Sequence, residues 1–202
     1  MPLLISELLG SVFQVILFSV IPFIWWVITS RKKENFLKWI GLKKLKKESS
    51  MVSTLIITVA ATLIYCILTS SYVIKNLEGV TTATSQFAGQ SYIGIAAALA
   101  YGYLRTGLSE ELVFRGFLLK RLSSKFGYVI GNILQALLFG LLHGVPFGIA
   151  TKNIGVMIVL TLLPGAFGYF QGWLNEKRFG GSIIPSWILH GTINFISAVL
   201  TI

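Results

Sequence analysis

Six residues of this 202-residue chain have the types and spacings that hydrolytic chemistry requires. They are Glu110, Glu111, Arg115, His143, His190 and Asn194, and the two histidines are the only ones in the chain. A carboxylate beside an imidazole can activate a water molecule. A second imidazole and an amide can donate hydrogen bonds to a developing oxyanion. Together these groups contain the parts needed to hydrolyse a peptide bond.

The spacing of these residues predicts which of them face one another. Side chains four residues apart lie on the same face of a helix. We therefore expect Glu111 to pair with Arg115, and His190 to share a face with Asn194. Glu110 points about 100° away from Glu111, which leaves it outside that ion pair. The pattern predicts a structural role for Glu111 and a chemical role for Glu110.

All of these residues lie among apolar segments. The chain is 54% hydrophobic and only 12% charged, and its mean hydropathy is +0.79, whereas a soluble domain carries about 25% charged residues. A charge near the centre of a bilayer costs about 2.5–3.5 kcal/mol and normally faces the bundle interior. The composition therefore predicts an all-α, polytopic transmembrane helix bundle with an intramembrane polar site.

Six spans are expected from the apolar segments. They cover about residues 8–29, 51–73, 92–120, 128–142, 154–174 and 183–202. A loop rich in glycine and proline is expected at 144–148, after the fourth span. Residues 92–120 would extend about 42 Å as one helix, more than the roughly 30 Å hydrocarbon core. This segment is either one long tilted helix or a helix broken near Gly107.

The net charge of +10 would suggest nucleic acid as a partner of a soluble protein. Here thirteen of the seventeen basic residues lie in three connections, at 31–50, 120–127 and 175–181. The positive-inside rule then places these loops in the cytoplasm and both termini outside. Membrane lipids are the expected partners of these charges, and nucleic acid is not. The eight basic residues of 31–50 alternate with apolar ones, which favours a short amphipathic helix on the cytoplasmic leaflet.

Other hydrolase chemistries lack their residues. The chain has no aspartate and no His-Glu-x-x-His sequence, which excludes a paired-aspartate site and the usual zinc-protease helix. Ser109 and Ser186 could serve as nucleophiles, but neither lies in a Gly-x-Ser-Gly loop. Each histidine alone could be a packing residue, and Glu111–Arg115 alone could be a helix-stabilising pair. Their joint occurrence favours a glutamate-centred site.

Three short motifs resemble those of the CPBP family of intramembrane proteases. They are Glu110-Glu111-x-x-x-Arg115, Phe139-x-x-x-His143 and His190-x-x-x-Asn194. The family includes CAAX prenyl proteases of the second type and bacteriocin-processing, immunity and lysostaphin-resistance-like (Abi) proteins. The resemblance covers about residues 90–200. It implies a protease core at 90–202, preceded at 1–75 by two transmembrane helices with a basic linker.

The resemblance also implies a role for each motif residue. Glu110 and His143 would hold and activate the attacking water, and His190 and Asn194 would stabilise the oxyanion. Three further residues would support the site: Glu111, Arg115 and Phe139. Family members are often labelled metalloproteases, and Glu110, His143 and His190 could bind zinc with one position open for water. A metal-free site without a cofactor is favoured, because the motif fits an oxyanion role for His190.

The expected substrate is a membrane-associated peptide or protein cleaved near the cytoplasmic face. The small, Lys-rich chain looks bacterial, which predicts the bacterial cytoplasmic membrane and makes a prenylated substrate a poor fit. The alternative is a non-catalytic immunity or scaffold protein that binds a peptide or partner in the same pocket. A small transporter is disfavoured because the sequence shows no internal repeat. The natural substrate, the cleavage position and the oligomeric state stay open.

Overall fold

Helices form every element of secondary structure in the part of the chain that the structure describes, residues 2–46, 50–77 and 79–202. This computed structural model confirms the all-α prediction for that part. Residues 47–49 of the predicted basic linker lie outside it. The chain divides into two units. The first comprises Met1–Lys44, Thr81–Phe117 and Ser182–Ile202, and the second comprises Leu45–Val80 and Leu118–Gly181.

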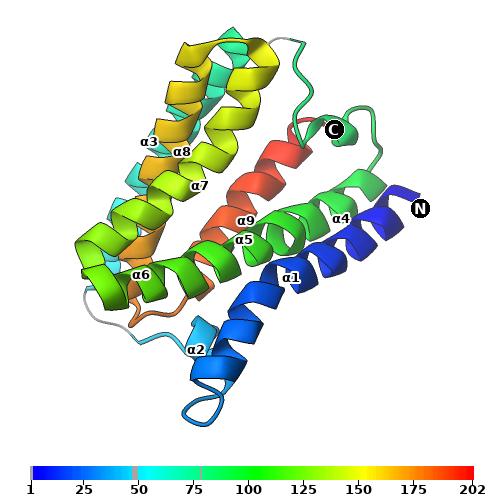
Figure 1. Ribbon diagram of the computed structural model, residues 1–202. Coiled ribbons are helices and arrows are strands. Elements are labelled where there is room, and N and C mark those ends of the chain that lie inside the picture. The colour runs from blue at the N-terminus through cyan, green and yellow to red at the C-terminus, as the bar shows by residue number, and fades with distance from the viewer. Residues whose placement is uncertain (1, 47–49, 78) are drawn as a thin grey trace. The chain divides into compact units, whose positions relative to one another are not determined.

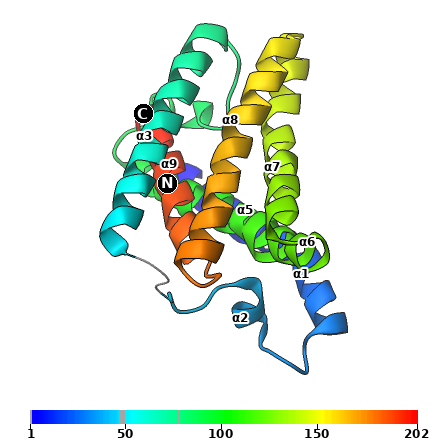
Figure 2. The same cartoon turned by 90° about the vertical axis from the view of Figure 1, so that its left-hand side faces the viewer.

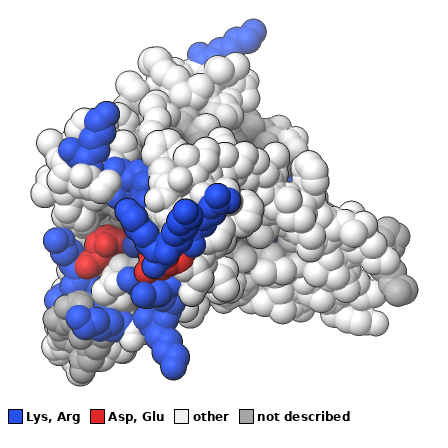
Figure 3. All heavy atoms as spheres, turned by 60° about the horizontal axis from the view of Figure 1, so that its bottom comes forward, with Lys and Arg blue, Asp and Glu red and all other residues white. Residues whose placement is uncertain are grey.

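Among the described residues, four helical segments are long and apolar enough to cross a bilayer. They are Leu3–Thr29, Met51–Asn76, Tyr128–Thr151 and Ile154–Arg178. The protein is therefore a multi-pass membrane protein. On the face drawn in Figure 3, charged side chains cover a small part and uncharged residues cover most of the rest. The count of six spans stays a prediction. The last predicted span, α9 (Ile184–Val199), has 16 residues, or about 24 Å of helix.

The first unit is built around one long helical segment. It begins with α4 (Ile93–Leu99) and continues through η2 (Ala100–Leu108), α5 (Ser109–Glu111) and η3 (Leu112–Leu118). Helix α1 (Pro2–Thr29) and helix α9 both pack against η2 (Figure 1). A short 3-10 helix, η1 (Ser85–Phe87), and helix α2 (Phe36–Ile40) also belong to this unit. The motif residues Glu110 and Glu111 thus lie on a helix flanked by two others.

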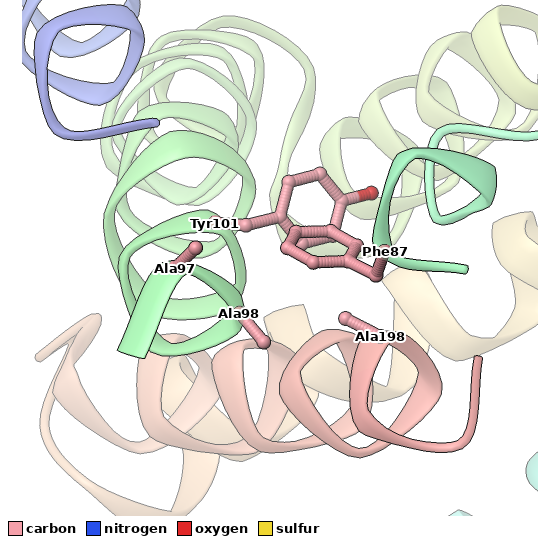
Figure 4. Packing of buried hydrophobic residues seen from close by; sticks show 5 residues of the cluster. All are labelled: Phe87, Ala97, Ala98, Tyr101 and Ala198. Carbon is pink, nitrogen blue, oxygen red and sulfur yellow. The ribbon is translucent and has the colours of Figure 1, made fainter. Parts of the chain in front are cut away.

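One end of this unit has an apolar core. Helix α4, η1, η2 and α9 contribute its fully or almost fully buried residues, Phe87, Ala97, Ala98, Tyr101 and Ala198. The rings of Phe87 and Tyr101 meet edge to face, with centroids 5.3 Å apart (Figure 4). The small alanine side chains let the α4 and α9 backbones approach closely, as in other membrane helix pairs.

The helix does not break near Gly107. Helical hydrogen bonding runs without interruption from Ile93 to the end of α6 (Leu119–Phe126), and two stretches of it are π-helical. Of the two possibilities predicted from the sequence, the continuous helix is the one found. In place of a break, η2 and η3 have the wider turn in which bonds span five residues, a backbone form common at functional sites. The 3.6-residue periodicity of a sequence cannot reveal such a turn.

Glycines bring α9 and η2 into backbone contact. A Cβ atom at Gly102 would lie 2.6 Å from the Phe195 nitrogen and 2.7 Å from the Gly191 carbonyl oxygen. A Cβ at Gly191 would lie 2.5 Å from the ring of Tyr103. Close approach through small residues is a usual basis of helix association in membranes. This contact sets the distance between the glutamates of α5 and the histidine of α9.

The predicted amphipathic helix on the leaflet is only partly present. Helix α2 (Phe36–Ile40) is a single turn, which ends because Gly41 adopts a left-handed conformation (φ 99°). Trp39 and Ile40 are buried in the protein, whereas Leu37 is 58% exposed. The expectation that the apolar residues face the bilayer is wrong for Trp39 and Ile40. Ile40 packs at Gly116, whose lack of a side chain leaves room for it.

The second unit contains α3 (Met51–Asn76), α6, α7 (Tyr128–Thr151), α8 (Ile154–Trp173) and η4 (Leu174–Arg178). Helices α7 and α8 lie side by side along their lengths, and α3 packs on α8 (Figure 2). The loop predicted at 144–148 is wrong, because α7 continues through it and includes Pro146. Gly144 and Gly148 serve close packing instead. A Cβ at Gly144 would lie 2.1 Å from Oγ1 of Thr161 on α8.

Candidate active site

Glu111 and Arg115 form a buried ion pair within the long helix of the first unit. Oε1 of Glu111 lies 3.2 Å from Nη1 of Arg115, and neither side chain has any exposed surface. Removing two charges from water is costly, and the attraction between the two side chains offsets this cost only when they are held close together. The pairing predicted from the four-residue spacing is confirmed.

Two residues of α9 also bind the Glu111 carboxylate. Nδ1 of His190 lies 3.1 Å from Oε1 of Glu111, and the hydroxyl of Ser186 donates a hydrogen bond to Oε2. Because an ionised carboxylate only accepts hydrogen bonds, Nδ1 of His190 carries a hydrogen. This contact fixes the imidazole ring and turns its other nitrogen, Nε2, away from Glu111.

Glu110 faces that other nitrogen. Its Oε2 lies 3.7 Å from Nε2 of His190, which is longer than a hydrogen bond. Oε2 of Glu110 is buried and has no hydrogen-bond partner among the described residues. An oxygen atom of a third group could lie about 2.8 Å from both atoms, a normal hydrogen-bond length. The site thus presents one carboxylate oxygen and one imidazole nitrogen to a common point.

Asn194 lies one helical turn beyond His190 on α9, and its side chain contacts η2. Its Nδ2 donates a hydrogen bond of 2.8 Å to Oγ1 of Thr106, and the Thr106 hydroxyl lies 3.1 Å from the Tyr101 and Gly102 carbonyl oxygens. The predicted shared face of His190 and Asn194 is confirmed, because both contact the segment between residues 100 and 111. An amide nitrogen has two hydrogens, so one remains for a second acceptor.

His143 and Phe139 belong to the second unit, on α7. Nδ1 of His143 lies 2.8 Å from the carbonyl oxygen of Phe139, and the two rings lie 4.5 Å apart between centroids. Since a carbonyl only accepts, this bond places a hydrogen on Nδ1. In the neutral ring Nε2 then carries a lone pair, which suits a base. The convergence of His143 with Glu110 stays a prediction.

Several polar contacts around the site do not follow from the sequence. The sequence suggests Ser186 only as a nucleophile, whereas its hydroxyl donates a hydrogen bond to Glu111. Elsewhere along α9, the hydroxyls of Tyr103 and Thr192 lie 2.8 Å apart, and Nε1 of Trp187 donates a 2.6 Å hydrogen bond to the Tyr103 carbonyl oxygen. These bonds hold α9 against η2. They join residues more than 80 positions apart in the chain, so no local sequence pattern predicts them.

The donors of the site can be compared with those that zinc requires. A structural or catalytic zinc ion takes at least three protein ligands. In the first unit Glu110 and His190 supply two donor atoms, 3.7 Å apart. Among the described residues, no group of three or more His, Cys, Asp or Glu side chains is arranged to hold a metal ion. The third candidate ligand, His143, belongs to the second unit, and the choice between a metal-free site and a zinc site stays a prediction.

A comparison with protein families identifies the region that contains these residues. A family model described as type II CAAX prenyl endopeptidase Rce1-like matches residues 92–196, which include all three motifs. Comparisons with curated proteins and with solved structures gave no match. The family match confirms the resemblance seen in the motifs. The chain therefore belongs to the Rce1-like family of type II CAAX prenyl endopeptidases, and it is a protease.

Proposed function

We propose that the protein is an intramembrane endopeptidase that cleaves a membrane-associated peptide or protein with a glutamate-activated water. The observation that carries this proposal is the pair formed by Glu110 Oε2 and His190 Nε2, which lie 3.7 Å apart at the end of a chain of buried polar contacts. The family match adds that the chain is a protease. The proposed location is a bacterial cytoplasmic membrane, with the scissile bond near its cytoplasmic face.

Glu110 is the proposed general base. It takes a proton from water as the water oxygen bonds to the carbonyl carbon of the scissile peptide. The same proton then passes to the amide nitrogen as the carbon–nitrogen bond breaks. The products are one carboxylic acid and one amine, and the glutamate returns to its starting state. His143 would assist by accepting a hydrogen bond from the water through Nε2, consistent with the hydrogen on its Nδ1.

His190 and Asn194 are the proposed oxyanion donors. With Nδ1–H directed at Glu111, His190 would donate to the substrate oxygen from Nε2, a role that requires a hydrogen on both ring nitrogens. The second amide hydrogen of Asn194 would be the other donor, an interaction worth about 10²–10³-fold in rate in other oxyanion sites.

The proposal is tested by comparing the peptides of membranes that contain the wild-type protein with those that contain Glu110→Gln. We expect mass spectrometry to find a set of cleaved peptides present only with the wild type, and their uncleaved precursors enriched with the variant. A non-catalytic immunity or scaffold protein predicts identical peptide sets. Identical sets would therefore overturn the proposal, and recurring new ends would identify the substrate.

The metal-free mechanism makes a separate prediction. Treatment of the purified protein with a strong zinc chelator should leave turnover of an identified substrate peptide within about twofold of the untreated value, because the proposed base and oxyanion donors are side chains. A control with a known zinc protease shows that the chelator is effective. Loss of activity that is restored by added zinc would contradict the prediction and favour Glu110, His143 and His190 as ligands.

A further inference from the structure

Helix α1 carries a polar stripe on the side that packs on the long helical segment from α4 to η3, residues 93–118, which we call the site helix. Glu7, Ser11 and Gln14 are four and three residues apart, so they share one face. Glu7 is 2% exposed and Ser11 is fully buried, whereas most of the large apolar residues of α1 are exposed. In a lipid environment polar side chains normally turn toward a protein partner. This face therefore marks a specific contact and not a lipid-facing surface.

Gln14 binds the turn that immediately precedes Glu110 and Glu111. Its Nε2 donates a 2.8 Å hydrogen bond to the carbonyl oxygen of Arg105 and lies 3.3 Å from Oγ of Ser109. The Ser109 hydroxyl donates to the same Arg105 carbonyl. Two side chains, one of them from a different helix, thus converge on a single backbone oxygen one turn before Glu110.

The π-helical turn takes away the backbone donor that this oxygen would have in an α-helix. In an α-helix the carbonyl of residue 105 would accept from the N–H of residue 109. Here the Ser109 N–H is directed to the carbonyls of Leu104 and Thr106 instead. A backbone carbonyl without a partner costs several kcal/mol in a membrane. Gln14 supplies a donor that the α-helical partner no longer provides, and so it stabilises the wide turn.

The rest of the stripe fixes the register of α1 along the site helix. Oε1 of Glu7 lies 2.6 Å from Nη1 of Arg105, and the Ser11 hydroxyl lies 3.3 Å from the Ala100 carbonyl oxygen. Gly10 lies beside the guanidinium, with room for a Cβ at 3.7 Å. These contacts place Gln14 opposite residues 105 and 109, where its amide can act.

We propose that Gln14 is a positioning residue for Glu110, and that α1 is part of the active-site scaffold although the family match begins at residue 92. By holding the Arg105 carbonyl, Gln14 maintains the π-helical turn, and the turn sets the direction in which α5 presents Glu110 toward His190. The inference rests on the proposed function only for the claim that the correct presentation of Glu110 matters for turnover.

Gln14→Met tests this inference, because methionine has a similar length and volume but no donor. We expect kcat to fall about 10- to 100-fold, the usual effect of a small misplacement of a catalytic group, with KM unchanged. The matched control is Gln90→Met, the same change at an exposed glutamine of the same unit, which should leave both constants unchanged. Wild-type kcat in Gln14→Met would overturn the inference.

A second measurement does not depend on activity. Arg105-Thr106 is the only Arg-Thr pair in the sequence, so carbonyl-¹³C arginine with ¹⁵N threonine isolates the Arg105 carbonyl in a solid-state NMR spectrum. Its resonance should move upfield in Gln14→Met, as for a carbonyl that loses a hydrogen bond, and stay in place in Gln90→Met. An unmoved resonance would overturn the inference.

Two further variants separate the possible failures. If Gln14→Met does not fold, Ser109→Ala removes the other side-chain donor of the same oxygen, and a smaller fall in kcat with the same upfield movement is expected. Wild-type values for both readouts in Ser109→Ala would then count against the inference. If Glu110→Gln retains turnover, the proposed function fails, whereas the NMR result still decides whether Gln14 holds the turn.

Discussion

Glu110→Gln should abolish turnover and leave the fold intact, whereas Glu111→Gln should destabilise the fold. Glu110→Gln removes the proposed base, an effect of about 10²–10⁴-fold on rate. Its stability should change little, because Oε2 of Glu110 has no hydrogen bond among the described residues and glutamine has the same shape. Turnover and thermal unfolding in detergent measure the two effects on one sample.

Glu111→Gln is the matched comparison, since the same substitution is made one residue away. It removes the charge that opposes Arg115 in a fully buried pair. Breaking such a pair costs about 3–5 kcal/mol, so we expect a large fall in the unfolding temperature. The double variant Glu111→Gln with Arg115→Met removes both charges and should recover part of the stability. A stable Glu111→Gln protein, or an active Glu110→Gln protein, would contradict the division of roles.

Gly102→Ala adds only one methyl group, but it should severely destabilise the protein. Its Cβ would lie 2.6 Å and 2.7 Å from backbone atoms of Phe195 and Gly191, and backbone cannot rotate out of the way as a side chain can. Overpacking of this kind typically costs about 1–3 kcal/mol and sometimes more. We expect the upper end of this range, together with a loss of turnover, because α9 carries His190 and Asn194. Denaturant unfolding in detergent and turnover of a substrate peptide measure the two effects.

Gly10→Ala provides the control for that substitution. Gly10 also lies in a helix of the first unit, but its Cβ would meet the Arg105 guanidinium at 3.7 Å, an ordinary contact. Alanine is favoured over glycine inside a helix by about 0.5–1 kcal/mol. Gly10→Ala should therefore be neutral or slightly stabilising. Similar losses of stability for both substitutions would show that the α9–η2 contact is less closely packed than these distances indicate.

Local patterns in the sequence were sufficient for part of the site. The four-residue spacing predicted the Glu111–Arg115 pair, and the structure has it at 3.2 Å. The shared face of His190 and Asn194 followed from the same rule. Helix periodicity is a local property, so it predicts contacts within one helix and the side that faces a partner. The roles assigned to Glu110 and His143 go beyond periodicity and stay predictions.

Other features depend on contacts that no local pattern encodes. Glu7 and Gln14 lie near the start of an apolar span, and nothing in their local spacing predicts that they bind Arg105 and Ser109, 98 and 95 positions away. Gly144 and Pro146 indicate a loop by composition, but α7 stays helical through them and packs closely on α8. The π-helical turns likewise depend on partners outside their own segment. In each case a tertiary contact outweighs the local preference.

The two arginines of the site helix differ in when their counter-ions become available during synthesis. Arg115 has its counter-ion, Glu111, one turn away on the same segment, so this charge is neutralised as soon as the helix forms. The counter-ion of Arg105 is Glu7 on α1, which leaves the ribosome about a hundred residues earlier. Vectorial synthesis thus places the carboxylate in the bilayer before the guanidinium that needs it. A chain that began after α1 would have to insert Arg105 without that partner.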